Sequence, residues 1–251
     1  MVAEPAPFTP LAAAPDTGSA RGAIELRGLT KRYGEETVVN AIAASIAPGE
    51  FFSLLGPSGS GKTTTLMIVA GFVRPDGGTV LLDGEDIAAV PPQKRGFGMV
   101  FQNYAIFPHL NVFENIAFPL RARHWAKDAI GARVAWALEL VRLGRFADRD
   151  ARELSGGQQQ RTSVARALLN ARPIVLGDEP VSALDRVQAG DVLRVLSERH
   201  ETKIFAMHDL RLALEHAERI ILLEGGRMVL DEPSSQLSYE RLLPHFEGEP
   251  Q

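Results

Sequence analysis

The sequence contains no cysteine, and this absence excludes disulfide bonds, thiolate chemistry and cysteine-ligated zinc. It also lacks a long apolar run: the stretches at 66–73 and 220–223 are far shorter than the roughly 20 residues that span a bilayer. A secretory signal is missing too, because the first residues have neither a basic start nor a continuous apolar stretch. We therefore expect a cytoplasmic chain that does not itself cross a membrane.

An excess of positive charge is likewise absent. Lys and Arg number 27 against 31 Asp and Glu, which gives a formal net charge of −4, and no dense basic stripe is present. Proteins that neutralise a nucleic-acid backbone need such a stripe, so nucleic acid is not expected as a partner. The 251 residues suffice for one large α/β domain, or two small domains sharing a sheet.

A glycine-rich phosphate loop is the first motif that the sequence does contain. An apolar run at 51–55 precedes it and a helical run at 63–70 follows it, which is the strand, loop and helix order that such a loop requires. We expect Lys62 to bridge the β- and γ-phosphates of a nucleotide and the Thr63 hydroxyl to bind Mg²⁺. The residues predicted to contact nucleotide here are Gly56, Pro57, Ser58, Gly59, Ser60, Gly61, Lys62, Thr63 and Thr64.

A second segment suited to anions lies far downstream, at Leu154-Ser155-Gly156-Gly157-Gln158. A serine and two glycines that open a helix present backbone N–H groups and a hydroxyl to an anion. The alternative is that Ser155 simply caps the helix, and one residue can do both.

Polar residues follow two further short apolar runs. Asp178 and Glu179 come after the run at 174–176, and His208 follows the run at 204–207. Since the carboxyl ends of parallel strands meet at one edge of a sheet, these residues would converge on the phosphate loop. We expect Asp178 to hold Mg²⁺ and Glu179 to polarise the attacking water. An ordinary acidic turn before Pro180 is the alternative, which the phosphate loop and the 182–185 turn disfavour.

The rest of the chain divides by composition. Residues 1–22 are rich in Ala and Pro and predict a disordered leader, because they cannot bury enough surface to offset ordering entropy. Short apolar runs from 23 onward suggest antiparallel strands. Helical spacing at 127–143 suggests a helical insertion at about 103–167, and 233–251 reads as a short tail.

In this order the motifs resemble those of the nucleotide-binding subunits of ATP-binding-cassette (ABC) transporters, over nearly all of 23–231. The resemblance implies an α/β fold: a P-loop NTPase (RecA-like) core with an N-terminal antiparallel β subdomain and an inserted helical subdomain. The ABC ATPase domain would run from 23 to 232. Gly177 departs from the family, which usually has a bulky apolar residue there, and a strand glycine is expected to loosen packing.

The resemblance also implies roles for residues that would otherwise be read as ordinary. Tyr33 would stack on adenine rather than be a surface ring, and Gln102 would contact Mg²⁺ and the lytic water rather than sit in a solvated loop. His208 would contact the γ-phosphate. The signature, which is the segment 154–158, would serve the nucleotide of a second subunit through Ser155, Gly156 and Gly157, so that a working site needs two chains. The resemblance also implies nucleotide contacts for Gln158 and for Asp185 of the 182–185 turn.

The function implied by the resemblance is an ATPase subunit that uses ATP and Mg²⁺ and pairs as a homodimer. The segments 97–109 and 112–118 resemble importers of polyamines, iron, sulfate and sugars, so an importer of a small solute is expected. Its partners would be transmembrane permeases and an extracytoplasmic solute-binding protein, and the chain itself would lie peripherally at the cytoplasmic face of the plasma membrane. The alternatives are an exporter subunit, a non-transport ABC ATPase, and a module that senses ATP without turnover, against which Glu179 and His208 argue.

Overall fold

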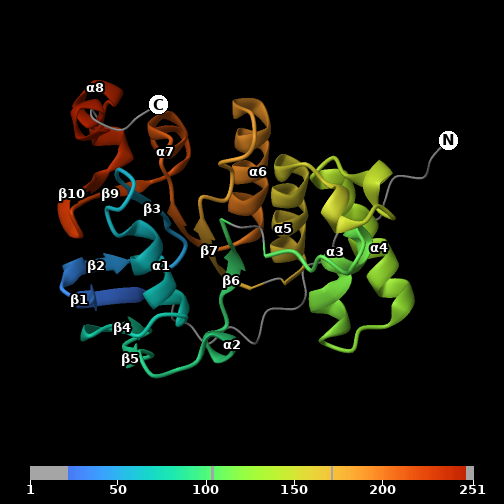
Figure 1. Cartoon of the computed structure of the whole chain (residues 1–251), viewed down its shortest axis with the longest axis horizontal. Helices are drawn as coiled ribbons and strands as arrows, with labels where there is room; N and C mark the ends of the chain where they lie inside the picture. Colours follow the sequence, from blue (N-terminus) through green and yellow to red (C-terminus); the bar gives the residue numbers. More distant parts are fainter. Residues whose placement is uncertain (1–21, 103–104, 171, 247–251) are drawn as a thin grey trace.

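Two β-sheets and the helices around them form the computed structural model of the chain, which describes residues 22–102, 105–170 and 172–246 (Figure 1). Of the predicted leader at 1–22, all but Gly22 lies outside the described residues. Residues 247–251 of the predicted tail lie outside them as well.

The first sheet is antiparallel and has the strand order β2-β1-β4-β5. Buried and exposed residues alternate along it, as in β2, where Ile42, Ala44 and Ile46 are buried and the residues between them are exposed. This period of two gives the sheet one buried face and one face toward solvent. Its strands are β1 (Ile24–Tyr33), β2 (Glu36–Ile46), β4 (Gly77–Leu82) and β5 (Glu85–Asp86).

The second sheet has six strands in the order β10-β9-β3-β8-β7-β6, of which only the β10 pairing is antiparallel. All residues of β3, β7 and β8 are buried, as expected for central parallel strands covered on both faces. The strands are β3 (Phe51–Leu55), β6 (Gly98–Val100), β7 (Ile174–Asp178), β8 (Thr202–Ala206), β9 (Arg219–Glu224) and β10 (Arg227–Pro233).

Helices lie against this sheet and at one end of it. Figure 1 shows α3 and α4 gathered at the end away from the antiparallel sheet, with α5 and α6 between them and the centre. No helix in the described ranges is both long and apolar enough to cross a membrane. The helices are α1 (Lys62–Ala70), α2 (Pro92–Arg95), α3 (Val112–Arg121), α4 (Lys127–Leu140), α5 (Gly156–Asn170), α6 (Arg186–Arg199), α7 (Leu210–His216) and α8 (Tyr239–Leu242), and short 3₁₀ turns lie at Gly144–Phe146, Ala151–Glu153, Ser234–Gln236 and Leu243–Phe246.

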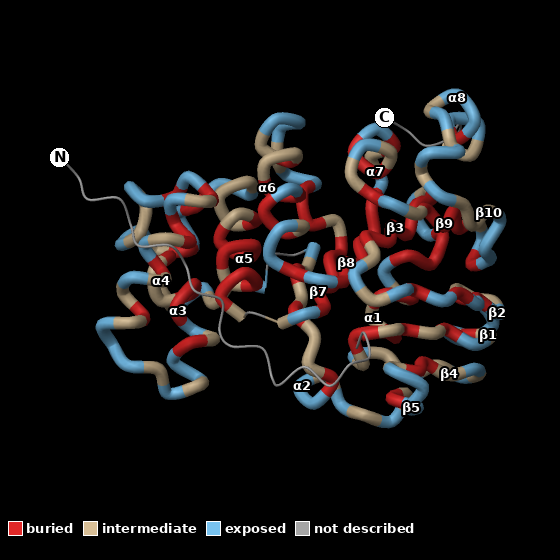
Figure 2. Tube along the Cα trace, turned by 180° about the vertical axis from the view of Figure 1, so that it is seen from behind, coloured by how far each residue is buried: buried red, intermediate tan, exposed pale blue. Residues whose placement is uncertain are grey.

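The parallel sheet separates two apolar cores, and β3 contributes to both. Phe51 and Leu55 belong to the core that the helices α3 to α7 cover, whereas Phe52 and Leu54 belong to the core shared with α1 and the antiparallel sheet. In Figure 2 the buried residues follow these central strands. Because both faces are covered, side chains at the carboxyl ends of the strands are the ones left to meet a ligand.

Gly177 in β7 is closely packed, and the expectation of loosened packing is wrong. A Cβ atom at this position would lie 2.8 Å from Cδ1 of Phe205 and 3.0 Å from Cγ of Pro180. The Phe205 ring, which also makes an edge-to-face contact with Phe51 at 5.0 Å, occupies the space that a larger side chain at 177 would need.

Candidate active site

The phosphate loop connects β3 to α1 and depends on glycine at two points of close approach. Gly56 (φ 147°) and Gly61 (φ 98°) have backbone conformations that side chains disfavour. A Cβ atom on Gly56 would lie 2.2 Å from the carbonyl oxygen of Leu223, and one on Gly61 would lie 2.5 Å from that of Val38. The loop therefore packs against β9 and β2 as closely as backbone allows.

Lys62 begins α1 and is buried, with its side chain turned back over the loop. Its Nζ donates hydrogen bonds to the carbonyl oxygens of Gly56 (2.6 Å) and Pro57 (2.8 Å). No side chain caps the first turn of α1, whose cap residue is Gly61. The N-terminal end of α1, where the helix dipole is positive, and the Lys62 ammonium group thus meet at one place, which suits an anion such as a phosphate.

Thr63 and Asp178 bring two oxygen ligands together beside this loop. The Thr63 Oγ1 atom donates a hydrogen bond of 2.8 Å to Oδ1 of Asp178, at the end of β7. Only 2% of Asp178 is exposed, and burial raises its pKa above the ordinary value, against the opposing effect of the bond from Thr63. Hard oxygen ligands of this kind suit Mg²⁺, and a cation here would favour the ionised form of a carboxyl group that burial disfavours.

Glu179 joins the ends of three adjacent strands. Its Oε2 atom accepts a hydrogen bond of 3.2 Å from Nε2 of Gln102, which lies two residues beyond β6, and lies 3.6 Å from Nδ1 of His208 beyond β8. The backbone of Glu179 has φ 49°, a region that non-glycine residues rarely adopt, and its N–H donates to Ala206 O at 2.9 Å. Such strain persists only where the surroundings enforce it and is common at functional sites.

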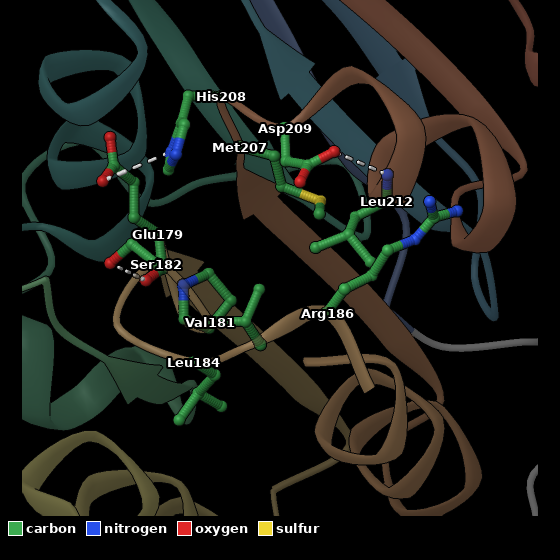
Figure 3. Close-up of a pocket in the computed structure, with 10 residues that line it drawn as sticks. Glu179, Val181, Ser182, Leu184, Arg186, Met207, His208, Asp209 and Leu212 are labelled. Carbon is green, nitrogen blue, oxygen red and sulfur yellow. Dashed lines mark hydrogen bonds and ion pairs between the residues drawn. The ribbon is translucent and has the colours of Figure 1, made fainter. Parts of the chain in front are cut away.

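A cavity of about 90 Å³ opens beside Glu179 and His208. Figure 3 shows these two side chains directed toward one another at one side of it, with Met207 and Leu212 on the other. The cavity thus has a polar side, formed by Glu179 and His208, and an apolar side. The Glu179 carboxylate and the His208 imidazole lie at the border between the protein interior and solvent.

The signature segment forms the start of α5, and Ser155 caps it. The Ser155 Oγ atom accepts from the Gln158 N–H at 3.3 Å, and the Ser155 N–H donates to Gln158 Oε1 at 3.0 Å. This reciprocal pair is a capping box. Ser155 and Gly156 are exposed, and a Cβ atom on Gly157 would lie 2.8 Å from the Ala183 carbonyl oxygen.

The structure does not bring every predicted residue to the phosphate loop. Figure 1 shows α5 separated from α1 along the long axis, with β6 and β7 between them. Asp185 caps α6, accepting from the Gln188 N–H at 2.9 Å. Tyr33 is 52% exposed at the end of β1, with Lys31 Nζ 5.5 Å from its ring centroid.

Gln160 is a residue of this region that sequence reasoning missed. It is fully buried in α5, and its Nε2 atom donates to Glu179 O at 2.9 Å and to Ser182 Oγ at 3.3 Å. Its Oε1 atom accepts from the Ala183 N–H at 2.8 Å. These hydrogen bonds from Gln160 hold α5 against the turn that follows Glu179. Its spacing of four from Val164 and of eight from Leu168, both apolar, could have placed it on the buried face of the helix.

Comparison with known proteins decides the family. A family model described as ABC transporter matches residues 39–182. The chain belongs to the ABC transporter family. Solved ABC cassettes have the same fold: the ATP-binding cassette MJ0796, in a dimeric post-hydrolysis state bound to ADP and Pi, has a TM-score of 0.78 and 32% identity, and covers 84% of this chain and 98% of its own. A second dimeric structure of that bacterial ABC transporter cassette has a TM-score of 0.78, 33% identity and the same coverage. The predicted resemblance and fold class are confirmed.

Curated members of the ABC family are similar to this chain over most of its length. The spermidine/putrescine import ATP-binding protein PotA of Chromobacterium violaceum is 44% identical over 233 residues, which are 90% of this chain and 64% of the relative. The protein of the same name from Haemophilus influenzae is 46% identical over 212 residues, 83% of this chain and 57% of the relative. The chain thus spans less than two thirds of the length of these relatives.

Proposed function

We propose that the chain is the ATP-binding and ATP-hydrolysing subunit of an ABC importer for a small solute. The observation that carries the proposal is the cluster around Glu179, in which Gln102 and His208 both contact its carboxylate beside the phosphate loop. The similarity to relatives named for spermidine and putrescine import makes a polyamine the first solute to test. Iron and sulfate remain further candidates from the sequence.

In this proposal the phosphate loop holds the nucleotide. The N–H groups at the start of α1 and the Lys62 ammonium would bind the β- and γ-phosphates, with Tyr33 stacked on the adenine ring. Thr63, Asp178 and Gln102 would hold Mg²⁺, and the bound ion would neutralise phosphate charge. Lys62 would exchange its bonds to Gly56 and Pro57 for bonds to phosphate oxygens, so the apo contacts keep its ammonium at the right place.

Hydrolysis would break the bond between the γ-phosphorus and the bridging oxygen while a water oxygen forms the new bond in line with it. Glu179 would align and polarise that water, and Gln102 would hold the carboxylate by the bond seen here. His208 would contact the γ-phosphate and meet the charge that develops on it. Positioning and charge stabilisation supply most of the catalysis in such sites.

We further propose that two chains share each site. The exposed start of α5 lies apart from the phosphate loop of its own chain, so Ser155, Gly156 and Gly157 would close over the nucleotide of a second copy. The dimeric cassettes of similar fold support this arrangement. The ABC ATPase domain would run from 23 to 232 with the helical insertion at about 103–167, followed by the tail at 233–251.

Transmembrane permeases would dock beside Gln102. Phe72 is 53% exposed and Phe118 is 44% exposed, and their rings contact Phe101 and Phe107 at 5.4 and 4.5 Å. Exposed aromatic clusters of this kind mark protein contact surfaces. The chain would then act at the cytoplasmic face of the plasma membrane, with a solute-binding protein delivering the solute on the other side.

The test combines turnover with transport. The full chain, reconstituted in vesicles with the permeases encoded beside it, should hydrolyse ATP and accumulate radiolabelled spermidine. Glu179→Gln should lower hydrolysis at least about a hundredfold while ATP binding persists. Glu215→Gln, an exposed acid paired with Arg186 on the surface, is the matched control and should behave as the parent. Turnover of Glu179→Gln at the parental rate would refute the role of Glu179, and efflux instead of uptake would refute import.

A further inference from the structure

Arg95, the last residue of α2, is a buried arginine that is 5% exposed. It forms no ion pair within residues 22–102, 105–170 and 172–246, and burial lowers its pKa while the charge of Asp86 opposes that effect. A buried guanidinium is costly unless its donors are satisfied, so its partners indicate what it holds in place.

Those partners are four backbone carbonyl oxygens from two separate segments. Nη1 donates to Ile68 O (2.9 Å) and Val69 O (2.7 Å), in the last turn of α1. Nε donates to Val90 O (2.8 Å) and Nη2 to Ala88 O (3.2 Å), in the segment before α2. The guanidinium thereby binds carbonyls at the end of the phosphate-binding helix, where a positive charge is also favoured by the helix dipole.

Gly71 makes room for this arrangement. It ends α1 with φ 87°, and a Cβ atom there would lie 2.4 Å from Nε of Arg95. The helix end and the guanidinium are therefore fitted to one another, and Arg95 occupies the space that a side chain at 71 would fill.

The chain leads directly from Arg95 to Gln102. After Gly96 it enters β6, which is the edge strand of the parallel sheet and pairs through only Gly98–Val100 with β7. Beyond β6, the Phe101 ring meets the Phe72 ring edge to face at 5.4 Å, and Phe72 directly follows Gly71. A three-residue edge strand has few ladder bonds of its own, so these two attachments to the end of α1 matter for where Gln102 lies.

We infer that Arg95 is a positioning residue, which holds Gln102 in register with the phosphate-binding helix by joining the last turn of α1 to the segment that enters β6. The inference rests on the proposed function. The first turn of α1 contains Lys62 and Thr63. Its last turn binds Arg95, which holds the segment that leads through β6 to Gln102. The helix and the glutamine are then positioned as one unit against Glu179.

The test is a double-mutant cycle between Arg95 and Gln102 in the full chain. Arg95→Lys keeps the charge but loses the planar fork that reaches both segments. We expect kcat for ATP hydrolysis to fall about tenfold, well below the hundredfold that a 1 Å misplacement can cost, with KM for ATP little changed. In a Gln102→Ala background the same substitution should have no further effect on kcat, because the group it positions is gone. Arg27→Lys, in an exposed pair with Glu25, is the control and should match the parent.

Two results would overturn the inference: an unchanged kcat in Arg95→Lys, or an equal loss in both backgrounds, which would mean a general structural role. If Arg95→Lys fails to fold, Gly71→Asn carries the same prediction, since Asn tolerates the left-handed conformation while its Cβ displaces the guanidinium. Absence of hydrolysis in the parent chain would instead overturn the proposed function, and this inference with it.

Discussion

The hydroxyl of Thr63, in the first turn of α1, donates a hydrogen bond of 2.8 Å to the carboxylate of Asp178, 115 residues away at the end of β7. The bond joins the helix that would bind phosphate to the strand that leads into Glu179. It also places two oxygen ligands for a cation at the junction of these elements.

Thr63→Val should raise the Mg²⁺ concentration that ATP hydrolysis requires. The substitution removes one oxygen ligand and leaves the buried Asp178 without its donor, so the Mg²⁺ concentration for half-maximal activity should rise roughly tenfold or more. Thr65→Val is a matched control in the same helix, because the Thr65 hydroxyl is buried without a hydrogen-bond partner and its loss should be harmless. Titration of activity with Mg²⁺ measures both, and an unchanged midpoint in Thr63→Val would exclude Thr63 as a ligand.

The stability of the nucleotide-free chain should carry a pH signature from Asp178. Burial raises the pKa of Asp178 in the folded state, so the folded chain binds more protons than the unfolded chain between the ordinary pKa and the raised one. The stability that protonation provides is present below the ordinary pKa and is lost as pH rises through the raised pKa. In urea unfolding, the free energy of unfolding of Asp178→Asn should therefore rise relative to that of the parent as pH increases through this window. A constant difference between the two proteins would contradict the raised pKa.

Mixed dimers should reveal whether two chains share each site. Lys62→Ala should disable the phosphate loop and Ser155→Arg the signature, so neither protein alone should hydrolyse ATP. When the two proteins are mixed in equal amounts, half of the dimers should contain one chain of each variant. Each such dimer has one intact site of two, so roughly a quarter of the parental activity should return. The measurement is ATP turnover against mixing ratio. Sites complete within one chain would give no recovery at any ratio.

Gly177→Ala should destabilise the core, even though alanine is a small residue. The new methyl group would press on Phe205 and Pro180, and overpacking of this kind costs about 1–3 kcal/mol. Gly131→Ala is the control: this glycine lies within α4 with no atom near its missing Cβ, so alanine should stabilise the helix by about 0.5–1 kcal/mol. Chemical denaturation compares them, and a stable Gly177→Ala protein would show that β7 and β8 can separate at little cost.

Much of the site could be predicted because its signals are local. The glycines before Lys62 indicate a loop with an unusual backbone, and the two acids after an apolar run indicate the end of a strand. The order of the motifs then identified the family. The contacts of Gln160 and Arg95 gave no such signal, since these side chains bind backbone carbonyl and N–H groups of distant segments. Gly177 was misjudged for a related reason: the ring that fills its space comes from Phe205, on the neighbouring strand.

The distance between α1 and α5 within one chain, with β6 and β7 between them, has a consequence for behaviour on dilution. If the start of α5 completes the site of another copy, turnover per molecule must fall as the chain is diluted, because fewer copies are paired. Tethering two copies to one membrane assembly would replace that bulk concentration by a high local one. Highly diluted, unpaired chains would then be nearly inactive, and ATP consumption in a cell would be concentrated in the assembled complex.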